Sequence, residues 1–452
     1  MQSIGRHGAG KAVPSMVPLP DCCGYGKAMR IFLTGASGFI GGHVLQGLVA
    51  RGHAVTCLVR AQAREKLDAQ HLAGVTTVVG EFTRPQDWLA QLPGHQAVVN
   101  SVGIIRQTKH STFDAVHRDA PLALFRAAQA AGAKAIQISA LGADARAVSR
   151  YHLSKRAADE GLAALGIPYV ILRPSFVYGP GDHSMTFFRS LAALPITLVP
   201  GDGQYQVQPV HVDDVLEAVL RAVERPELTG LTLDLGGASA ISFDHLLDCL
   251  ARQLGKSSAR KWHVPWGLME RVAQVTDAVG QGPITGEELA MLRQGSQGDN
   301  GPFEQAMGFA PMSFETGLAR HPLTEADRDH ARLVHFKVPL RLSVAFIWIA
   351  TGVVSAFLSP AEGFALLDRI GMTGGLASAA LYGTSLFEIA IGLATAVGWQ
   401  VRWMGAIQLL LMFGFMGILT ALLPEFWIHP FGPLTKNIPL IGATLVMMAW
   451  EK

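Results

Sequence analysis

The longest stretches without a charged residue lie together in the last quarter of the sequence. They cover Leu342–Leu358, Ile370–Phe387, Trp403–Leu423 and Ile438–Trp450. About 20 apolar residues in a helix, at roughly 1.5 Å per residue, cross the hydrocarbon core of a bilayer. The first three runs therefore predict membrane spans. The fourth predicts another if it is extended back to Leu434.

Charged residues divide the chain into two parts. Residues 338–452 hold only 10 of the 37 basic and 35 acidic residues, and five of the eight tryptophans. Tryptophan is typical of the two interfaces of a membrane. We therefore predict a soluble body followed, over 338–452, by an all-α transmembrane four-helix bundle in contact with the lipid bilayer. A buried soluble bundle is the alternative, but the uncharged runs are too long for it.

Basic residues beside these runs predict the orientation of the chain. Arg332, Lys337 and Arg341 precede the first run, and Arg402 joins the second to the third. Because cytoplasmic loops carry an excess of basic residues, we expect a multi-pass protein of the inner (cytoplasmic) membrane with its soluble body on the cytoplasmic side. Glu388 interrupts the second span, where a carboxyl group is costly. It either makes a hydrogen bond inside the bundle or has a ligand or proton role.

Composition excludes several other classes. A net charge of +2 leaves no basic excess for nucleic acid, and 49% hydrophobic residues exclude a disordered chain. The four cysteines lack the spacing of a metal site, so we expect no metal. Residues 1–28 contain no apolar run typical of a secretory signal, and we expect a disordered extension there.

Short apolar runs alternate with helical patterns between residues 29 and 236. Helices are expected at Gly41–Arg51 and Ala120–Ala131. This alternation predicts an α/β fold, a doubly wound parallel sheet of the Rossmann type. The expected strands are Arg30–Thr34, Ala54–Val59, Val75–Val79, Ala97–Ser101, Ala135–Ser139, Tyr169–Leu172 and Leu231–Leu235.

The first expected strand runs into a glycine-rich turn. Its GxxGxxG spacing opens a helix, where glycines let the backbone approach a pyrophosphate and the helix N-terminus supplies N–H groups. A flexible turn is the alternative, but the strand-turn-helix context favours a NAD(P)-binding site. The expected cofactor contacts in this turn are Gly35, Ser37, Gly38, Phe39, Ile40 and Gly41.

The end of the second strand indicates which nucleotide binds. Enzymes that use NAD place a carboxylate there, whereas this chain has Arg60, with Arg64 nearby. A guanidinium suits a 2′-phosphate, which favours NADP(H) and leaves NAD(H) open. An ordinary surface arginine is the alternative. Glu81 after the third strand is assigned to the adenine amino group, and Ser101 is assigned to the cofactor site.

A Tyr-x-x-x-Lys sequence carries the expected chemistry. Tyr151 and Lys155 share one face of a helix. A nearby ammonium lowers the pKa of a tyrosine, which can then act as general acid and base. Ser139 ends the preceding strand and could polarise a carbonyl oxygen. We predict hydride transfer between nicotinamide and a carbonyl or alcohol, with Ser139, Tyr151 and Lys155 catalytic. Lys155 is also expected to hold the nicotinamide ribose, which makes the Tyr151/Lys155 pair part of the cofactor site.

These segments together resemble the extended and atypical short-chain dehydrogenase/reductase superfamily, also described as NAD-dependent epimerases/dehydratases. The resemblance covers residues 29–336. Its carrying segments are TGASGFIGGHV (34–44), QISALGADA (137–145), YHLSK (151–155), LRPSFVYGPGD (172–182) and QPVHVDDV (208–215). It implies that Pro174 passes near the nicotinamide and that Asp214 caps the helix beginning at the HVDD sequence.

Two details qualify the resemblance. The Ser-Ala-Leu-Gly-Ala run from Ser139 and the sequence Met312–Glu315 are similar to the branch that contains the nucleotide-binding accessory subunit of respiratory complex I. The resemblance to that branch implies a protein that binds NADPH more than one that turns over a substrate. The family also carries a Val-Asn pair that orders water near the active site. Here the pair is Val116-His117, so that His117 either replaces the asparagine or weakens catalysis.

Residues 237–337 are expected to form a small substrate lobe and linker. Helical patterns cover Phe243–Leu254, Leu268–Val279 and Gly286–Arg293. Their apolar residues either pack on the Rossmann body or line an apolar pocket. The lobe has no cluster of basic residues that would bind the diphosphate of a sugar nucleotide. A nucleotide-sugar epimerase/dehydratase is therefore the least favoured of the functional hypotheses.

The C-terminal part has a resemblance of its own. The sequence Trp427–Pro433, followed by Thr435–Pro439, is similar to the closing motif of DoxX-like four-helix membrane proteins. That family implies loose links to quinones and redox complexes. We therefore expect a membrane-anchored NAD(P)(H)-dependent oxidoreductase acting on an apolar or quinone-like substrate. The alternative is a non-catalytic NADPH-binding redox sensor or assembly factor of a respiratory or quinone-related membrane complex.

Overall fold

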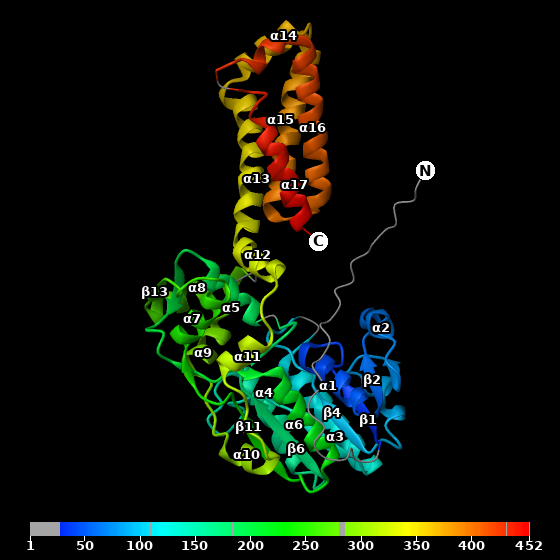
Figure 1. The fold of residues 1–452 in the computed structure, drawn as a ribbon. Helices are drawn as coiled ribbons and strands as arrows, with labels where there is room; N and C mark the ends of the chain where they lie inside the picture. The colour runs from blue at the N-terminus through cyan, green and yellow to red at the C-terminus, as the bar shows by residue number, and fades with distance from the viewer. Residues whose placement is uncertain (1–27, 109–110, 183, 280–284, 431, 452) are drawn as a thin grey trace, which may run out of the picture. The chain divides into compact units, whose positions relative to one another are not determined.

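The computed structural model describes residues 28–108, 111–182, 184–279, 285–430 and 432–451 (Figure 1). The extension predicted at residues 1–28 lies outside the described residues, apart from its last residue. The chain forms two compact units. The first comprises residues 1–183, 199–246 and 263–321, and the second 184–198, 247–262 and 322–452.

A seven-stranded parallel sheet organises the first unit. Its strand order is β11-β6-β5-β4-β1-β2-β3, so that the direction of winding reverses between β1 and β4. All seven strands were predicted, and the bounds differ by at most two residues. They are β1 (Arg30–Thr34), β2 (Ala54–Val59), β3 (Val75–Val79), β4 (Ala97–Asn100), β5 (Lys134–Ile138), β6 (Tyr169–Pro174) and β11 (Leu231–Leu235).

Helices cover both faces of the sheet because side chains of each strand alternate between two cores. Ile31 and Leu33 of β1 pack with residues of α1 (Phe39–Ala50) and α6 (Val212–Glu224). Phe32, between them, packs with the opposite core, to which α3 (Ala120–Ala131) and α4 (Arg150–Ala163) contribute. This confirms the doubly wound α/β prediction.

A buried ladder of polar side chains crosses the middle of the sheet. The Thr34 hydroxyl donates to Asn100 Oδ1 at 2.7 Å, and Asn100 Nδ2 donates to Gln137 Oε1 at 2.8 Å. All three side chains are fully buried at registered positions of β1, β4 and β5. Buried polar groups need such partners. The ladder therefore fixes the ends of these three strands against one another.

Smaller elements complete the first unit. The predicted helices of the lobe are present, with bounds shifted by one or two residues. The further elements are α2 (Ala61–Asp68), β7 (Val177–Tyr178), β9 (Gln206–Val207), β10 (Val210–His211), β12 (Ile241–Ser242), α8 (Trp266–Val279), α9 (Gly286–Gln294), α10 (Gly301–Met307) and α11 (Phe314–Arg320). Two further strands, β8 (Thr197–Pro200) and β13 (Lys261–Val264), and helix α7 (Phe243–Gln253) begin in one unit and end in the other.

The second unit is helical. Among the described residues, three of its helices are long and apolar enough to cross a membrane: residues 325–358, 374–397 and 401–422. The last helix has 14 residues, about 21 Å, and is shorter than the hydrocarbon core. The helices are α5 (Ser184–Ala193), α12 (Glu325–Leu333), α13 (Lys337–Val353), α14 (Pro360–Arg369), α15 (Gly374–Val397), α16 (Val401–Leu422) and α17 (Asn437–Trp450).

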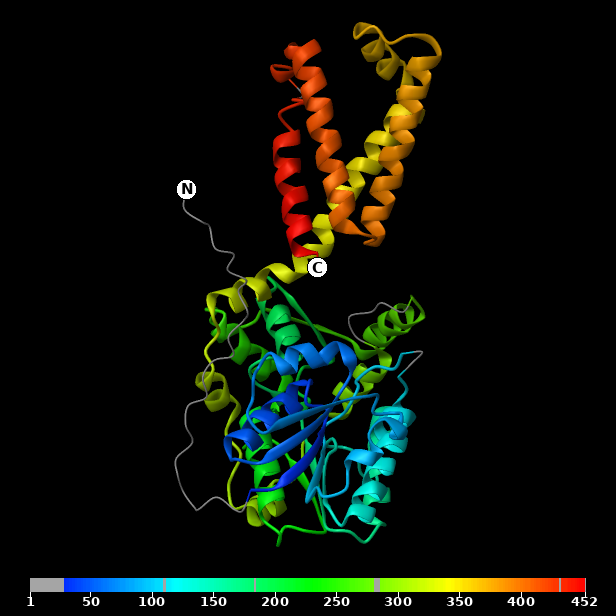
Figure 2. The ribbon, with the colours of Figure 1, turned by 90° about the vertical axis from the view of Figure 1, so that its right-hand side faces the viewer.

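The membrane helices pack in pairs. Helix α13 lies along α15, and α16 lies along α17 (Figure 2). Polar contacts join the helices: Gln408 Nε2 donates to Thr395 Oγ1 at 2.8 Å, and Glu388 forms a side-chain hydrogen bond with Thr351. The segment between the first two spans, expected as a loop, forms α14, which begins with a proline at its first position.

Candidate functional site

The glycine-rich turn forms a tight anion-binding geometry after β1. The Gly38 amide donates to the Gly35 carbonyl oxygen at 2.9 Å. Gly38 is the N-cap of α1. No side chain accepts a hydrogen bond from the first amides of this helix, and its first turn contains no acidic residue. Ser37 and Gly38 are exposed, and Phe39 and Ile40 are half-buried. The free N–H groups and the positive end of the helix dipole suit a phosphate.

Two glycines of this turn leave no room for a side chain. Gly35 has φ +83°, and a Cβ there would lie 2.6 Å from the Ser101 hydroxyl oxygen. A Cβ on Gly41 would overlap the Gly35 carbonyl oxygen and lie 2.5 Å from the same hydroxyl. The Ser101 hydroxyl donates to the Thr34 carbonyl oxygen at 2.7 Å. The cradle that a dinucleotide requires is thus present, and Ser101 is one of its walls.

The residues expected to select the nucleotide lie at the ends of neighbouring strands. Arg60 directly follows β2, is exposed, and makes no ion pair among the described residues. Arg64 pairs with Asp68 at 3.2 Å. Glu81, two residues after β3, is exposed, and its amide donates to Asp87 Oδ2 at 2.9 Å. Arg60 therefore has a free guanidinium at the edge of the sheet where the glycine-rich turn lies.

Helix α4 presents Tyr151 and Lys155 beside the ends of β4 and β5. The Lys155 ammonium donates to the carbonyl oxygens of Ile138, at 3.2 Å, and Val102, at 3.4 Å. Burial lowers the pKa of Lys155 to about 8, although nearby Asp159 acts to raise it. The lysine is therefore anchored to the same strand ends that surround the glycine-rich turn. Pro174 ends β6 and is buried.

Tyr151 is held as a neutral phenol. Burial raises its pKa to about 12. The net shift is therefore opposite to the lowering predicted from Lys155, because desolvation of the phenolate by burial outweighs the effect of the nearby ammonium. A phenol with a raised pKa keeps its proton at neutral pH, so the side chain of Tyr151 is a hydrogen-bond donor there.

Ser139 is paired with a carboxyl group that the sequence analysis missed. Its hydroxyl donates to Asp159 Oδ2 at 2.7 Å, and Arg173 Nε donates to the same oxygen at 3.1 Å. Burial raises the pKa of Asp159 to about 6, partly offset by these hydrogen bonds. Asp159 lies one helical turn beyond Lys155, on the face shared with Tyr151. The spacing of Tyr151, Lys155 and Asp159 at every fourth residue of one helix is the sequence pattern that could have indicated Asp159.

His117 occupies a π-helical turn, Asp114–Asp119, against Tyr151. Burial, and then the Lys155 charge, lower its pKa to about 3, so the imidazole is neutral. Its Nε2 accepts the Ile104 amide hydrogen at 2.9 Å, which leaves Nδ1 to donate to the Ser154 hydroxyl at 3.0 Å. Ser154 in turn donates to the Tyr151 carbonyl oxygen at 2.7 Å. His117 thus connects the loop after β4 to the start of α4.

Helix α9 of the lobe is tied to the same site. Glu287 Oε1 accepts the Tyr151 amide hydrogen at 2.9 Å. Glu288 accepts two hydrogen bonds of 2.8 Å from the Arg106 guanidinium. A cavity of about 410 Å³ lies beside α9, lined by Val148, Glu270, Gln274, Gly286, Ala290, Arg293 and Gln294. The apolar face of the lobe is partly open, since Leu268 and Val272 are about half exposed.

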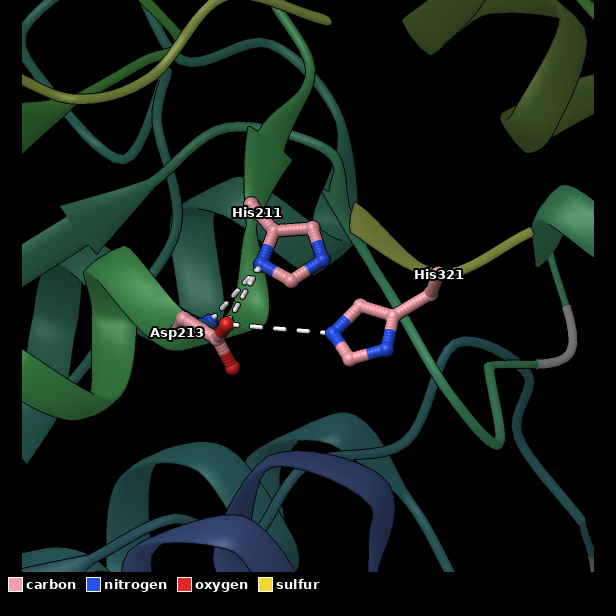
Figure 3. A group of neighbouring side chains, drawn as sticks. All are labelled: His211, Asp213 and His321. Carbon is pink, nitrogen blue, oxygen red and sulfur yellow. Dashed lines mark hydrogen bonds and ion pairs between the residues drawn. The ribbon is translucent and has the colours of Figure 1, made fainter. Parts of the chain in front are cut away.

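A group of three side chains near α6 has the composition of a metal site (Figure 3). His211 Nδ1 and His321 Nε2 lie 3.5 and 3.8 Å from Asp213 Oδ2. However, His211 Nδ1 already accepts the Asp213 amide hydrogen, and Arg320 pairs with Asp213 Oδ2 at 3.0 Å. His211 Nδ1 thus caps α6, and Asp213 is the ion-pair partner of Arg320.

This geometry corrects one expectation of the family resemblance. His211, and not Asp214, caps α6. The buried Asp214 carboxylate instead accepts the Met312 amide hydrogen at 3.0 Å. Asp214 therefore holds the segment before α11 and does not cap the helix.

Replacing Gly41 with alanine should abolish the nucleotide cradle. The new Cβ would displace the Gly35 carbonyl, and we expect NADPH to bind at least tenfold more weakly, measured by fluorescence titration of the purified protein in detergent. Gly42→Ala is the matched control on the same helix, because its Cβ would lie 3.6 Å from the Ala36 carbonyl oxygen, an ordinary contact. Equal binding by both variants would contradict the assignment.

Known proteins are similar to part of this chain. A ceramide reductase of Caulobacter vibrioides is 29% identical over 201 residues, which is 44% of this chain and 62% of that protein. Subunit 9 of the NADH dehydrogenase [ubiquinone] 1 alpha subcomplex of Mus musculus is 27% identical over 47% of this chain and 58% of its own length. The chain thus spans about 60% of the length of these two relatives.

The fold is also shared with solved structures. The crystal structure of gox2253 superposes with a TM-score of 0.54 at 23% identity, covering 67% of this chain and 99% of that one. Residues 31–233 match the NAD dependent epimerase/dehydratase family, and residues 345–445 match the DoxX-like family. The chain therefore joins a Rossmann domain that is similar to the NAD dependent epimerase/dehydratase family, over residues 31–233, to a DoxX-like domain, over residues 345–445.

Proposed function

We propose that this protein is a membrane-anchored, NADPH-dependent reductase of an apolar carbonyl compound. The observation that carries the proposal is Tyr151, a neutral phenol beside the anchored Lys155 at the strand ends that surround the glycine cradle. A tyrosine that holds its proton at neutral pH can donate it to a carbonyl oxygen, as the reduction of a carbonyl requires. The reductase relative from Caulobacter supports the same direction.

The proposed reaction needs one proton and one hydride. The nicotinamide supplies the hydride when bound. Tyr151 donates its phenolic proton to the carbonyl oxygen as the C=O π bond breaks, which gives an alcohol, and water then returns a proton to the tyrosine. Lys155 is charged below its pKa of about 8 and stabilises the transient phenolate. His117 and Ser154 hold the Tyr151 backbone during this transfer.

Ser139 has a more restricted role in this arrangement. Its hydroxyl proton is donated to Asp159, so it can polarise a substrate carbonyl only by turning away from that carboxyl group. We propose that Ser139 and Arg173 position Asp159, whose charge supports the Lys155 ammonium.

We propose that the substrate is soluble in the membrane and that the Rossmann domain lies on the cytoplasmic side of the inner membrane. The support is the DoxX-like domain, the three long apolar helices and the basic residues that precede the first of them. A quinone-like compound fits the same description.

A second candidate is a protein that binds NADPH without turnover and assists a membrane complex. The specific observations in its favour are the engaged Ser139 hydroxyl and the histidine in place of the family asparagine. The relative from the mouse NADH dehydrogenase supports it as well.

Tyr151→Phe separates the two candidates. In proteoliposomes with NADPH and a panel of apolar aldehydes, ketones and short-chain quinones, we expect this variant to lose at least 100-fold in kcat while NADPH binding changes less than twofold. Tyr169→Phe on β6 is the matched control and should keep full activity. Tight NADPH binding with no oxidation of NADPH by the unaltered protein would reject the reductase and favour the second candidate.

Arg60→Ala tests the choice of nucleotide. A charged hydrogen bond to the 2′-phosphate contributes about 1.5–3 kcal/mol, so we expect NADPH to bind at least tenfold more weakly and NADH to be unaffected. Arg64→Ala, which removes a guanidinium already paired with Asp68, should change neither affinity. If Arg60→Ala weakens both nucleotides equally, the 2′-phosphate assignment is wrong.

A further inference from the structure

Three cationic side chains of the second unit gather just before the first membrane span. Helix α12 packs on α5 (Figure 1), and Arg332 at its end donates to the Leu254 carbonyl oxygen at 3.0 Å. Lys256, two residues further, donates to the carbonyl oxygens that end α5, at 2.6–3.0 Å. Burial lowers the pKa of Lys256, and the charges of Arg332 and Arg260 lower it further.

None of these three cations forms an ion pair with a carboxylate within the described part of the chain. Arg260 and Arg332 are exposed, whereas the neighbouring Lys261 pairs with Asp248 at 2.7 Å. Unpaired like charges repel one another, and an external anion would relieve that repulsion.

The position of this cluster along the chain places it near the lipid headgroups. Helices α12 and α13 are joined by the 3-10 turn Val334–Phe336, and about 20 residues counted back from Leu358 fill the hydrocarbon core as far as Val338. Arg332 lies six residues before that point, near the end of α12. The headgroup region begins at the edge of the core, and the long side chain of an arginine can reach into it.

Exposed apolar side chains adjoin the cluster. The Thr197 amide donates to the Arg260 carbonyl oxygen at 2.7 Å, which pairs β8 with β13. Thr197 is fully buried, and the residues on either side of it, Ile196 and Leu198, are 52% and 53% exposed. Trp262, two residues after Arg260, is 66% exposed. Tryptophan beside basic residues is typical of a membrane interface.

We propose that these residues form a headgroup-binding face that rests on the bilayer surface and binds anionic phospholipid headgroups. The headgroup-binding face consists of Ile196, Leu198, Arg260, Trp262 and Arg332, whereas the neighbouring Lys256 ammonium donates its hydrogens to the carbonyl oxygens that end α5. Its cations meet lipid phosphates, and its apolar side chains enter the boundary between headgroups and acyl chains. This inference does not depend on the proposed reductase activity.

Photocrosslinking of the full-length protein in nanodiscs tests this face. With p-benzoylphenylalanine in place of Trp262, we expect lipid adducts in discs of phosphatidylcholine with 30% phosphatidylglycerol. Their yield should be at least fivefold above that of the same probe at Leu89, an exposed position of the Rossmann domain. Discs of phosphatidylcholine alone should give at least threefold fewer adducts.

Charge variants complete the test. Arg260→Gln with Arg332→Gln should lower the adduct yield at position 262 at least threefold, while the matched pair Arg84→Gln with Arg126→Gln, both exposed, should leave it unchanged. Elution profiles and melting curves show that the variants are folded. A yield equal to the Leu89 control, equal yields in the two lipid mixtures, or adducts to polypeptide in place of lipid would overturn the proposal.

Discussion

The close approach of Gly35 and Gly41 to Ser101 is the constraint on which the site depends. It brings the end of β4 against the turn after β1, where the winding of the sheet reverses. Ligands of open parallel sheets bind at this reversal, beyond the carboxyl ends of the strands. The polar ladder from Thr34 to Gln137 holds the same strand ends, and Lys155 is anchored to the segments that follow them. The cradle and the Tyr151/Lys155 pair are thus positioned by a single sheet edge.

Much of the fold could be predicted because the apolar runs and the glycines in the sequence coincide with the strands that are buried in the sheet and with the ends of the helices. Strand β1 is a short apolar run on a sheet buried on both faces, and α3 has the predicted bounds because Gly132 ends it in the left-handed conformation. The tyrosine–lysine spacing likewise placed both side chains on one helix face. The pKa of Tyr151 was predicted in the wrong direction because burial depends on neighbours that are distant in sequence.

Other parts of the site arise only from contacts between distant segments. Asp159 meets Ser139 and Arg173 across 20 and 14 residues, and Glu287 reaches the Tyr151 amide from 136 residues away. His117 was recognised as a departure from the family pattern, yet its hydrogen bonds to Ile104 and Ser154 follow from a π-helical turn that the sequence did not indicate. The chain is also adapted to two environments: charged residues concentrate in the Rossmann part, whereas the DoxX-like part has few charges and carries most of them at helix ends or between helices.

The most direct test of the account is the path of hydrogen from cofactor to product. The protein in proteoliposomes is incubated with NADPH deuterated at both positions of nicotinamide C4 and an apolar aldehyde or ketone that supports NADPH oxidation, and the product is analysed by mass spectrometry. The account predicts an alcohol with one deuterium on the former carbonyl carbon and an oxygen-bound hydrogen that exchanges with water. NADPH oxidation without deuterium in the product, or no alcohol from any compound in the panel, would contradict it.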